Sequence, residues 1–128
     1  MRDLATELGP VNAIAPAVLS ATATGDAIDL NGFNAAAIVI STGAIAGSGD
    51  FTPTVQESDT TTAGDFTDVA AADMAGTLPA TLGANTTAKA SYIGYKRYIR
   101  VVLTKNSGTS VAATAMVVKS RADSRPVA

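Results

Sequence analysis

The chain has 128 residues, no Cys, no His and no Trp, and its formal net charge at pH 7 is −2. This length predicts a single domain that can bury a core without disulfides or a bound metal. Because neither His nor Cys is present to carry protons, ligate transition metals or act as a nucleophile, we expect a protein that is not an enzyme and holds no cofactor and no metal.

The first 16 residues differ in pattern from the rest of the chain. They contain two prolines, Pro10 and Pro16, and no regular hydrophobic period. Their apolar residues are scattered, at Leu4, Leu8, Val11 and Ile14. We predict an extended N-terminal arm at 1–16, followed by one β-sandwich domain at 17–128. Such an arm can add a strand to the sheet edge of another subunit, and the alternatives are a frayed terminus or a first strand of the chain's own sheet.

Alternation of apolar and polar residues predicts strands along the rest of the chain. The clearest is 97–105, where Ile99, Val101 and Leu103 share one face. Further strands are expected at 17–23, 28–30, 33–42, 51–58, 89–95 and 111–119. About seven short strands at this spacing predict an all-β protein with an antiparallel β-sandwich or jelly-roll-like fold.

Turn residues indicate how these strands are connected. Asn31-Gly32 separates a short apolar stretch from the strand that follows, and both residues tolerate the positive φ angles of tight hairpin turns. Residues 106–109, Asn-Ser-Gly-Thr, join the last two predicted strands. We therefore predict two hairpins. Because Pro53 cannot donate a ladder hydrogen bond, the strand at 51–58 is expected at a sheet edge or with a bulge.

The stretch around 68–75 is the exception to the β pattern. Asp68 is a suitable N-cap, an Ala-rich run follows it, and Gly76 stands where a helix often ends. We predict one or two helical turns there. The flanking loops are rich in Thr, Ala and Gly and are expected on the surface.

The expected cellular compartment follows from the absence of a long apolar segment and of a secretion signal in the sequence. No segment approaches the roughly 20 apolar residues that a membrane-spanning helix needs, and the N-terminus does not read as a secretion signal. We therefore expect a protein that is made and folded in a cytoplasm and has no membrane partner.

Charge is segregated along the chain. Residues 3–88 contain ten acidic residues and no Lys or Arg, whereas 89–128 contain eight basic residues and one acid, Asp123. Like charges in such long runs repel unless a partner compensates them. The two halves are expected to meet, either within one chain, between copies, or on a larger assembly.

The basic group Lys96, Arg97 and Arg100 alternates with tyrosines. Such groups can bind nucleic acid through phosphate contacts and base stacking. The sequence pI of about 4.8 and the lack of a nucleic-acid-binding motif favour protein contact instead. That contact is either with another subunit or a cross-strand charge ladder against the acidic half, and we expect no nucleic acid partner.

Acidic residues between the predicted strands suggest one further chemistry. Asp59, Asp65 and Asp68 could supply oxygen ligands for Ca²⁺, although their spacing does not match an EF-hand loop. Solvated turn acids are the expected interpretation. If these acids did bind Ca²⁺, the protein could be a calcium-dependent carbohydrate-binding module, which is the alternative function. A rise in melting temperature on addition of Ca²⁺ or a glycan would indicate it.

Four stretches resemble a family of viral structural proteins. They are Gly-Asp-Phe-Thr at 49–52, Gln-Glu-Ser-Asp at 56–59, Asp-Phe-Thr-Asp-Val at 65–69 and Tyr-Lys-Arg-Tyr-Ile-Arg-Val at 95–101. Through them, and over most of its length, the chain resembles capsid decoration (cement) proteins of tailed bacteriophages and prophages of marine alphaproteobacteria. The resemblance implies a virion protein on the outer capsid surface, often a homotrimer, whose partner is the major capsid protein.

We therefore expect a structural protein that stabilises an icosahedral head by bridging neighbouring capsid subunits. The arm and the basic group supply the expected subunit or capsid contacts: Arg2, Leu4, Leu8, Val11, Lys96, Arg97 and Arg100. Charged contacts between copies would make attachment to the capsid sensitive to salt. If the charges instead pair inside the chain, attachment would depend more on apolar and backbone contacts. A tail-tube, connector or fibre β-domain of a phage is the alternative, and assembly into rings or fibres would distinguish it.

Overall fold

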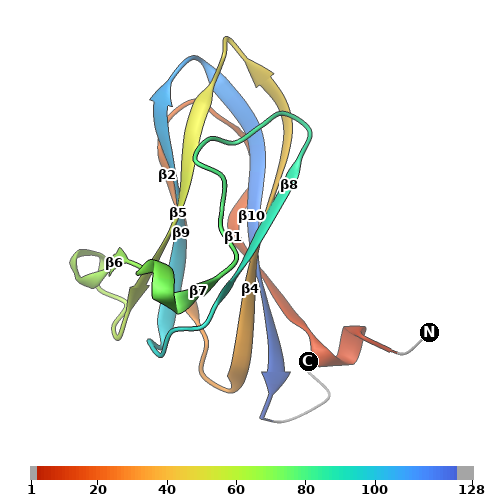
Figure 1. Cartoon of the computed structure of the whole chain (residues 1–128), viewed down its shortest axis with the longest axis vertical. Helices are drawn as coiled ribbons and strands as arrows, with labels where there is room; N and C mark the ends of the chain where they lie inside the picture. The colour runs from red at the N-terminus through yellow and green to blue at the C-terminus, as the bar shows by residue number, and fades with distance from the viewer. Residues whose placement is uncertain (1–2, 124–128) are drawn as a thin grey trace.

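The computed structural model describes residues 3–123, which form two antiparallel sheets packed face to face (Figure 1). The β10 sheet consists, in spatial order, of β1 (Gly9–Leu19), β10 (Ser110–Ala122), β4 (Phe33–Ala46), β8 (Thr87–Tyr92) and β7 (Met74–Ala75). The β9 sheet consists of β2 (Ala23–Thr24), β9 (Tyr98–Ser107), β5 (Asp50–Ser58) and β6 (Thr67–Asp68), and β3 (Ile28–Asp29) also pairs with β9. Three 3-10 turns lie in the connections: η1 (Ala5–Glu7), η2 (Ala63–Asp65) and η3 (Ala71–Asp73). The predicted all-β antiparallel sandwich is confirmed.

The core lies between the sheets and is built from alternate residues of each strand. In β9, Ile99, Val101 and Leu103 are fully buried, and the residues between them are not. The largest fully buried side chains are Phe51, Ile38, Ile40, Ile99, Leu103, Val101, Val111 and Val117. The inward face predicted for 97–105 is therefore confirmed, because successive side chains of a strand point to opposite sides of its sheet.

The backbone nitrogen of Pro53 points to the edge of β5 that faces away from β9. The Phe51 carbonyl accepts a hydrogen bond from the Leu82 N–H, and the Val55 carbonyl accepts one from the Val69 N–H, both at 3.0 Å. Pro53 is two residues from both Phe51 and Val55, so its nitrogen points to the same edge of β5 as their carbonyls. β6 pairs with β5 at Gln56 and Glu57 and does not extend to Pro53. Along this stretch β5 is a sheet edge, as the proline predicted, and a loop covers it.

Both predicted hairpins are wrong in their strand pairing. The Asn31-Gly32 turn forms, with the Phe33 N–H donating to the Leu30 carbonyl and a φ of 89° at Gly32, but it joins β3 of one sheet to β4 of the other. Strands β9 and β10 also lie in different sheets. Each already has neighbours on both edges, so neither edge of β10 is open to β9. The turn residues determine the local bend and not the partner strand.

The arm prediction is wrong for residues 9–16. They belong to β1, which pairs with β10 along its length, so the alternative of a first strand in the chain's own sheet is the one observed. Ala13 and Ile14 are buried in the core. The two prolines are tolerated because β1 is an edge strand with a register shift on either side of Ile14. The sandwich therefore starts at Gly9, and only residues 3–8 of the described chain precede it.

The predicted helix at 68–75 is reduced to the single 3-10 turn η3, and Asp68 does not cap it. Asp68 lies in β6, where its Oδ1 accepts a hydrogen bond from Gln56 Nε2 at 2.9 Å. Ala70 precedes the turn and makes no side-chain capping hydrogen bond. None of the turn's residues is buried, and so short a helix is not stable without packing. Within residues 3–123, no helix has the length and apolarity needed to cross a membrane.

Candidate interaction surfaces

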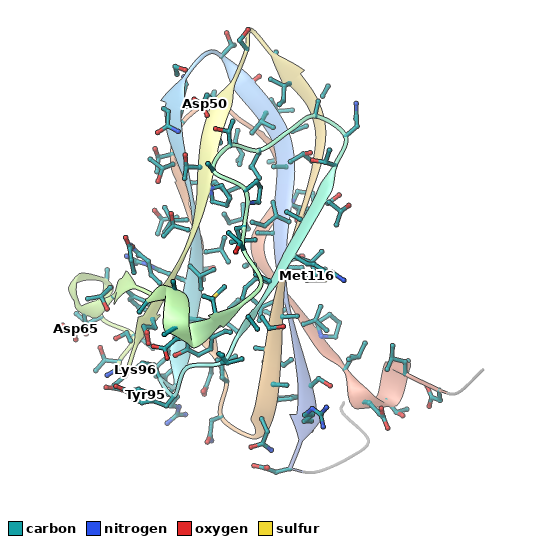
Figure 2. The ribbon with its side chains drawn as sticks, in the orientation of Figure 1. Asp50, Asp65, Tyr95, Lys96 and Met116 are labelled. Atoms are coloured by element: carbon teal, nitrogen blue, oxygen red, sulfur yellow. The ribbon has the colours of Figure 1, made fainter. Side chains whose placement is uncertain are left out.

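Lys96 and Arg97 form ion pairs with acids from the first half of the chain. Lys96 Nζ lies 2.7 Å from Asp59 Oδ2. Arg97 donates two hydrogen bonds to Asp29, from Nε to Oδ1 at 2.9 Å and from Nη2 to Oδ2 at 2.8 Å. Figure 2 shows Lys96 beside Tyr95 near one end of the sandwich. At these two positions the basic and acidic parts of the sequence pair within one chain, and contact with a partner stays a prediction.

Arg100 lies on the outer face of β9 and has a neutral partner. Its Nε donates to Gln56 Oε1 at 2.8 Å, and Gln56 in turn donates to Asp68 on β6. The guanidinium also lies 4.4 Å from the centroid of the Phe66 ring, a cation–π contact. The outer face of the β9 sheet is therefore polar, with hydrogen bonds running across β9, β5 and β6.

The Arg97 pair makes stability depend on acid pH. The hydrogen bond from Arg97 lowers the pKa of Asp29 from its usual 3.8 to about 2. Because the folded-state pKa lies below the unfolded one, the contribution of the pair is present above pH 3.8 and is lost as the pH falls through about 2.

We expect Arg97→Gln to lower the free energy of unfolding at pH 7 by less than about 1 kcal/mol, since the pair is exposed. The difference between variant and parent should disappear near pH 2, where Asp29 becomes protonated. Urea denaturation of both proteins at neutral pH and at pH 2 measures this. An equal difference at both pH values would contradict the assignment.

The acids that could have bound Ca²⁺ point to separate partners. Asp65 Oδ2 accepts a hydrogen bond from Thr60 Oγ1 at 2.7 Å. Asp59 and Asp68 have the partners described above. Over residues 3–123, no three or more acidic side chains gather in a way that could hold a metal ion. The structure does not bring the three candidate ligands together.

The N-terminal contact candidates lie at one end of the β10 sheet. Arg2 is outside the described residues. Leu4 directly precedes η1, is 59% exposed, and belongs to a segment that extends beyond the β1 edge of the β10 sheet in Figure 1. Leu8 is half-buried, and Val11 packs against the core from β1. Leu4 is therefore available for contact with a neighbour, whereas Val11 helps to hold the sandwich together.

The outer face of the β10 sheet, which we call the uncharged face, was not predicted from the sequence. Cross-strand register places its side chains in rows, one of which runs Asn12, Met116, Val39, Lys89 across β1, β10, β4 and β8. Its other residues include Pro10, Val18, Ala35, Ala37, Ser41, Thr87, Ser91, Ala112, Thr114, Val118 and Ser120. Among these outward positions, Lys89 is the one charged residue. In Figure 2 the Met116 side chain points away from the β9 sheet.

The sequence did contain a signal for this face. In the two longest strands, β4 and β10, the outward positions are Ala, Val, Met, Ser and Thr instead of charged residues. A sheet face in contact with water normally carries polar residues, and a strand that is apolar at both sets of alternate positions is typical of a sheet covered on both sides. The uncharged face is therefore a candidate interaction surface.

A hollow of about 490 Å³ crosses one end of the uncharged face. It extends from Leu8 before β1, past Val118 of β10 and Ala37 of β4, to Ile93 after β8. Ile93 is 59% exposed, so an apolar side chain borders the hollow without cover from its own chain. An apolar side chain from another protein chain could fill this hollow.

Comparisons of the chain with protein-family models, curated proteins and solved structures find no match. Its surfaces are therefore interpreted from their own chemistry. The two broad faces differ: one is polar and internally hydrogen-bonded, and the other carries Lys89 as its one charged residue.

Proposed function

We propose that this protein is a non-enzymatic structural protein of a phage virion, which decorates the outer capsid surface and cements an icosahedral shell by bridging subunits of the major capsid protein. The observation that supports the proposal is the uncharged face, because an extended, nearly uncharged surface on a folded domain marks a part of a larger assembly. The resemblance of four sequence stretches to decoration proteins supports the same role.

Cementing requires binding and no chemistry. Many copies, each contributing modest contact energy, hold neighbouring shell subunits together against internal pressure. Since Lys96 and Arg97 are paired inside the chain, apolar and backbone contacts supply most of the attachment. Such contacts are screened little by salt.

We expect purified protein to co-sediment saturably with undecorated phage heads, with a Kd that changes by less than about threefold between low and high salt. The double variant Arg97→Gln, Arg100→Gln should bind equally well, because both side chains have partners in their own chain. Quantifying bound protein after sedimentation of the heads measures both effects. Absence of binding, with rings or fibres formed by the protein alone, would contradict decoration and favour a tail-tube, connector or fibre domain.

A further inference from the structure

We infer that two copies of this chain pair face to face through the uncharged face, around a two-fold axis that runs between β10 and β4. The inference goes beyond the proposed function and holds whether or not the protein binds a capsid. A two-fold contact brings the same surface of both copies together, so it tolerates few charges of one sign. At the outward positions of β1, β10, β4 and β8, Lys89 is the one charged residue, so the uncharged face meets this requirement.

The position of Lys89 within its row prevents the two lysines from meeting. Because the axis runs along the strands between β10 and β4, it places β8 of one copy opposite β1 of the other. Lys89 then faces Asn12 of the second copy, whose amide oxygen can accept a hydrogen bond. Met116 faces Val39 of the second copy in the same row. In this row the centre of the contact is apolar and its two polar pairs lie at the rim, as in stable protein interfaces.

The face is large enough for a stable dimer. Its four strands have 11, 13, 14 and 6 residues. At about 3.3 Å per residue and about 4.8 Å between strands, they cover roughly 700 Å². Stable interfaces bury about 800 Å² on each partner. Little more than this face is needed.

The N-terminal segment supplies the remaining contact. The hollow lies at one end of the β10 sheet, and residues 3–8 project from the β1 edge at this same end (Figure 1). The two-fold axis therefore places this segment opposite the hollow of the second copy. The segment is preformed, since Asp3 accepts hydrogen bonds from the Ala5 N–H and Thr6 Oγ1, both at 2.9 Å. Leu4 then reaches the exposed Ile93 of the second copy. Two apolar side chains that are uncovered in one chain cover each other in the pair.

The alternative of a cyclic trimer, implied by the resemblance, fits this face less well. A trimer joins two different surfaces of each copy. The other broad surface carries the hydrogen-bonded series Arg100, Gln56 and Asp68, which would lose water against an apolar partner. The uncharged face is complementary to itself and not to that surface.

The first test is the mass of the full chain in sedimentation equilibrium. We expect twice the chain mass of 12.8 kDa. Met116→Lys places a charge beside the axis and should raise the dimer Kd at least about tenfold, whereas Thr104→Lys adds the same charge to the exposed outer face of β9 and should leave it unchanged. Far-UV circular dichroism checks that each variant is folded. A monomeric or trimeric parent, or an unchanged Kd for folded Met116→Lys, would overturn the inference.

A charge exchange tests the axis itself. Asn12→Lys should weaken pairing about tenfold, because it puts two lysines together at each rim, and adding Lys89→Glu to the same chain should restore it. The two positions are separated by β10 and β4 within one chain, so restoration requires contact between copies. Failure of the second change to restore pairing would exclude this axis. A dimer that does not bind heads would contradict only the proposed function, and a monomer that binds heads would contradict only the pairing.

Discussion

Phe51→Ala is expected to lower the free energy of unfolding by about 3–5 kcal/mol. The Phe51 ring is fully buried between the two sheets. Its removal loses apolar burial and leaves a cavity in the core between the sheets. Leu82, whose N–H is bonded to the Phe51 carbonyl, belongs to the same core and loses a neighbour from that cluster.

Urea denaturation followed by far-UV circular dichroism measures this loss, at one fixed protein concentration so that self-association does not change the comparison. Tyr95→Ala is the matched control, because Tyr95 is 83% exposed and its removal should change stability by less than about 0.5 kcal/mol. A loss below about 1.5 kcal/mol for Phe51→Ala would show that the two sheets close over the gap.

The second large effect is expected for Tyr92→Phe, with a loss of about 1–3 kcal/mol. Tyr92 comes from β8 and reaches across the core, where its Oη donates to Glu57 Oε1 at 3.2 Å and accepts from the Lys96 N–H at 3.0 Å. Glu57 is a buried carboxylate on the inward side of β5. Without the hydroxyl, the Glu57 carboxylate loses its hydrogen bond from Tyr92. Because Glu57 is buried, water cannot readily replace this bond.

Alkaline pH provides an independent measurement of the same group. Burial, together with the nearby Glu57 carboxylate, raises the pKa of Tyr92 from 10.0 to about 12. Since the folded-state pKa lies above the unfolded one, the contribution of the neutral phenol is complete below pH 10.0 and is lost as the pH rises through about 12. The Tyr92→Phe protein should lack this dependence, and Tyr95→Phe should retain it. Identical alkaline unfolding of the parent and Tyr92→Phe would contradict the assignment.

Short-range patterns predicted the strands well. Alternation identified the buried side of β9 at Ile99, Val101 and Leu103, because side-chain direction in a strand depends only on the neighbouring residues. Pro53 predicted a sheet edge for a similarly local reason, since a missing N–H can be placed only where no ladder bond is required.

Strand pairing was not predictable in the same way. The Asn31-Gly32 bend is local, but whether the chain returns to the same sheet or crosses to the other depends on which strand edges are already paired. Residues 9–16 resembled an arm because Pro10 and Pro16 interrupt their pattern. Their partner, β10, lies about a hundred residues away in the sequence, as the bond from Thr114 Oγ1 to the Ile14 carbonyl shows.

The candidate surfaces show the same division. The sequence identifies the basic group Lys96, Arg97 and Arg100 but does not determine its partner. The pairing of Arg97 with Asp29 could not be read from the sequence, because it depends on β3 lying next to β9. The absence of charge from the outward positions of β4 and β10 was visible, but its meaning depends on which face of each strand the core covers.

The pairing of β1 with β10 also determines when the protein can fold during its synthesis. β10 lies between β1 and β4, yet it is the last of the strands within residues 3–123 to be synthesised. Until residue 122 has been made, β1 and β4 lack the strand that joins them, and their uncharged edges remain open to other nascent chains. Folding of this sheet therefore depends on long-range contacts that form only after β10 has been made, which makes it slow and gives chaperones time to act. A ribosome that stops before residue 110 releases a chain in which no strand joins β1 to β4.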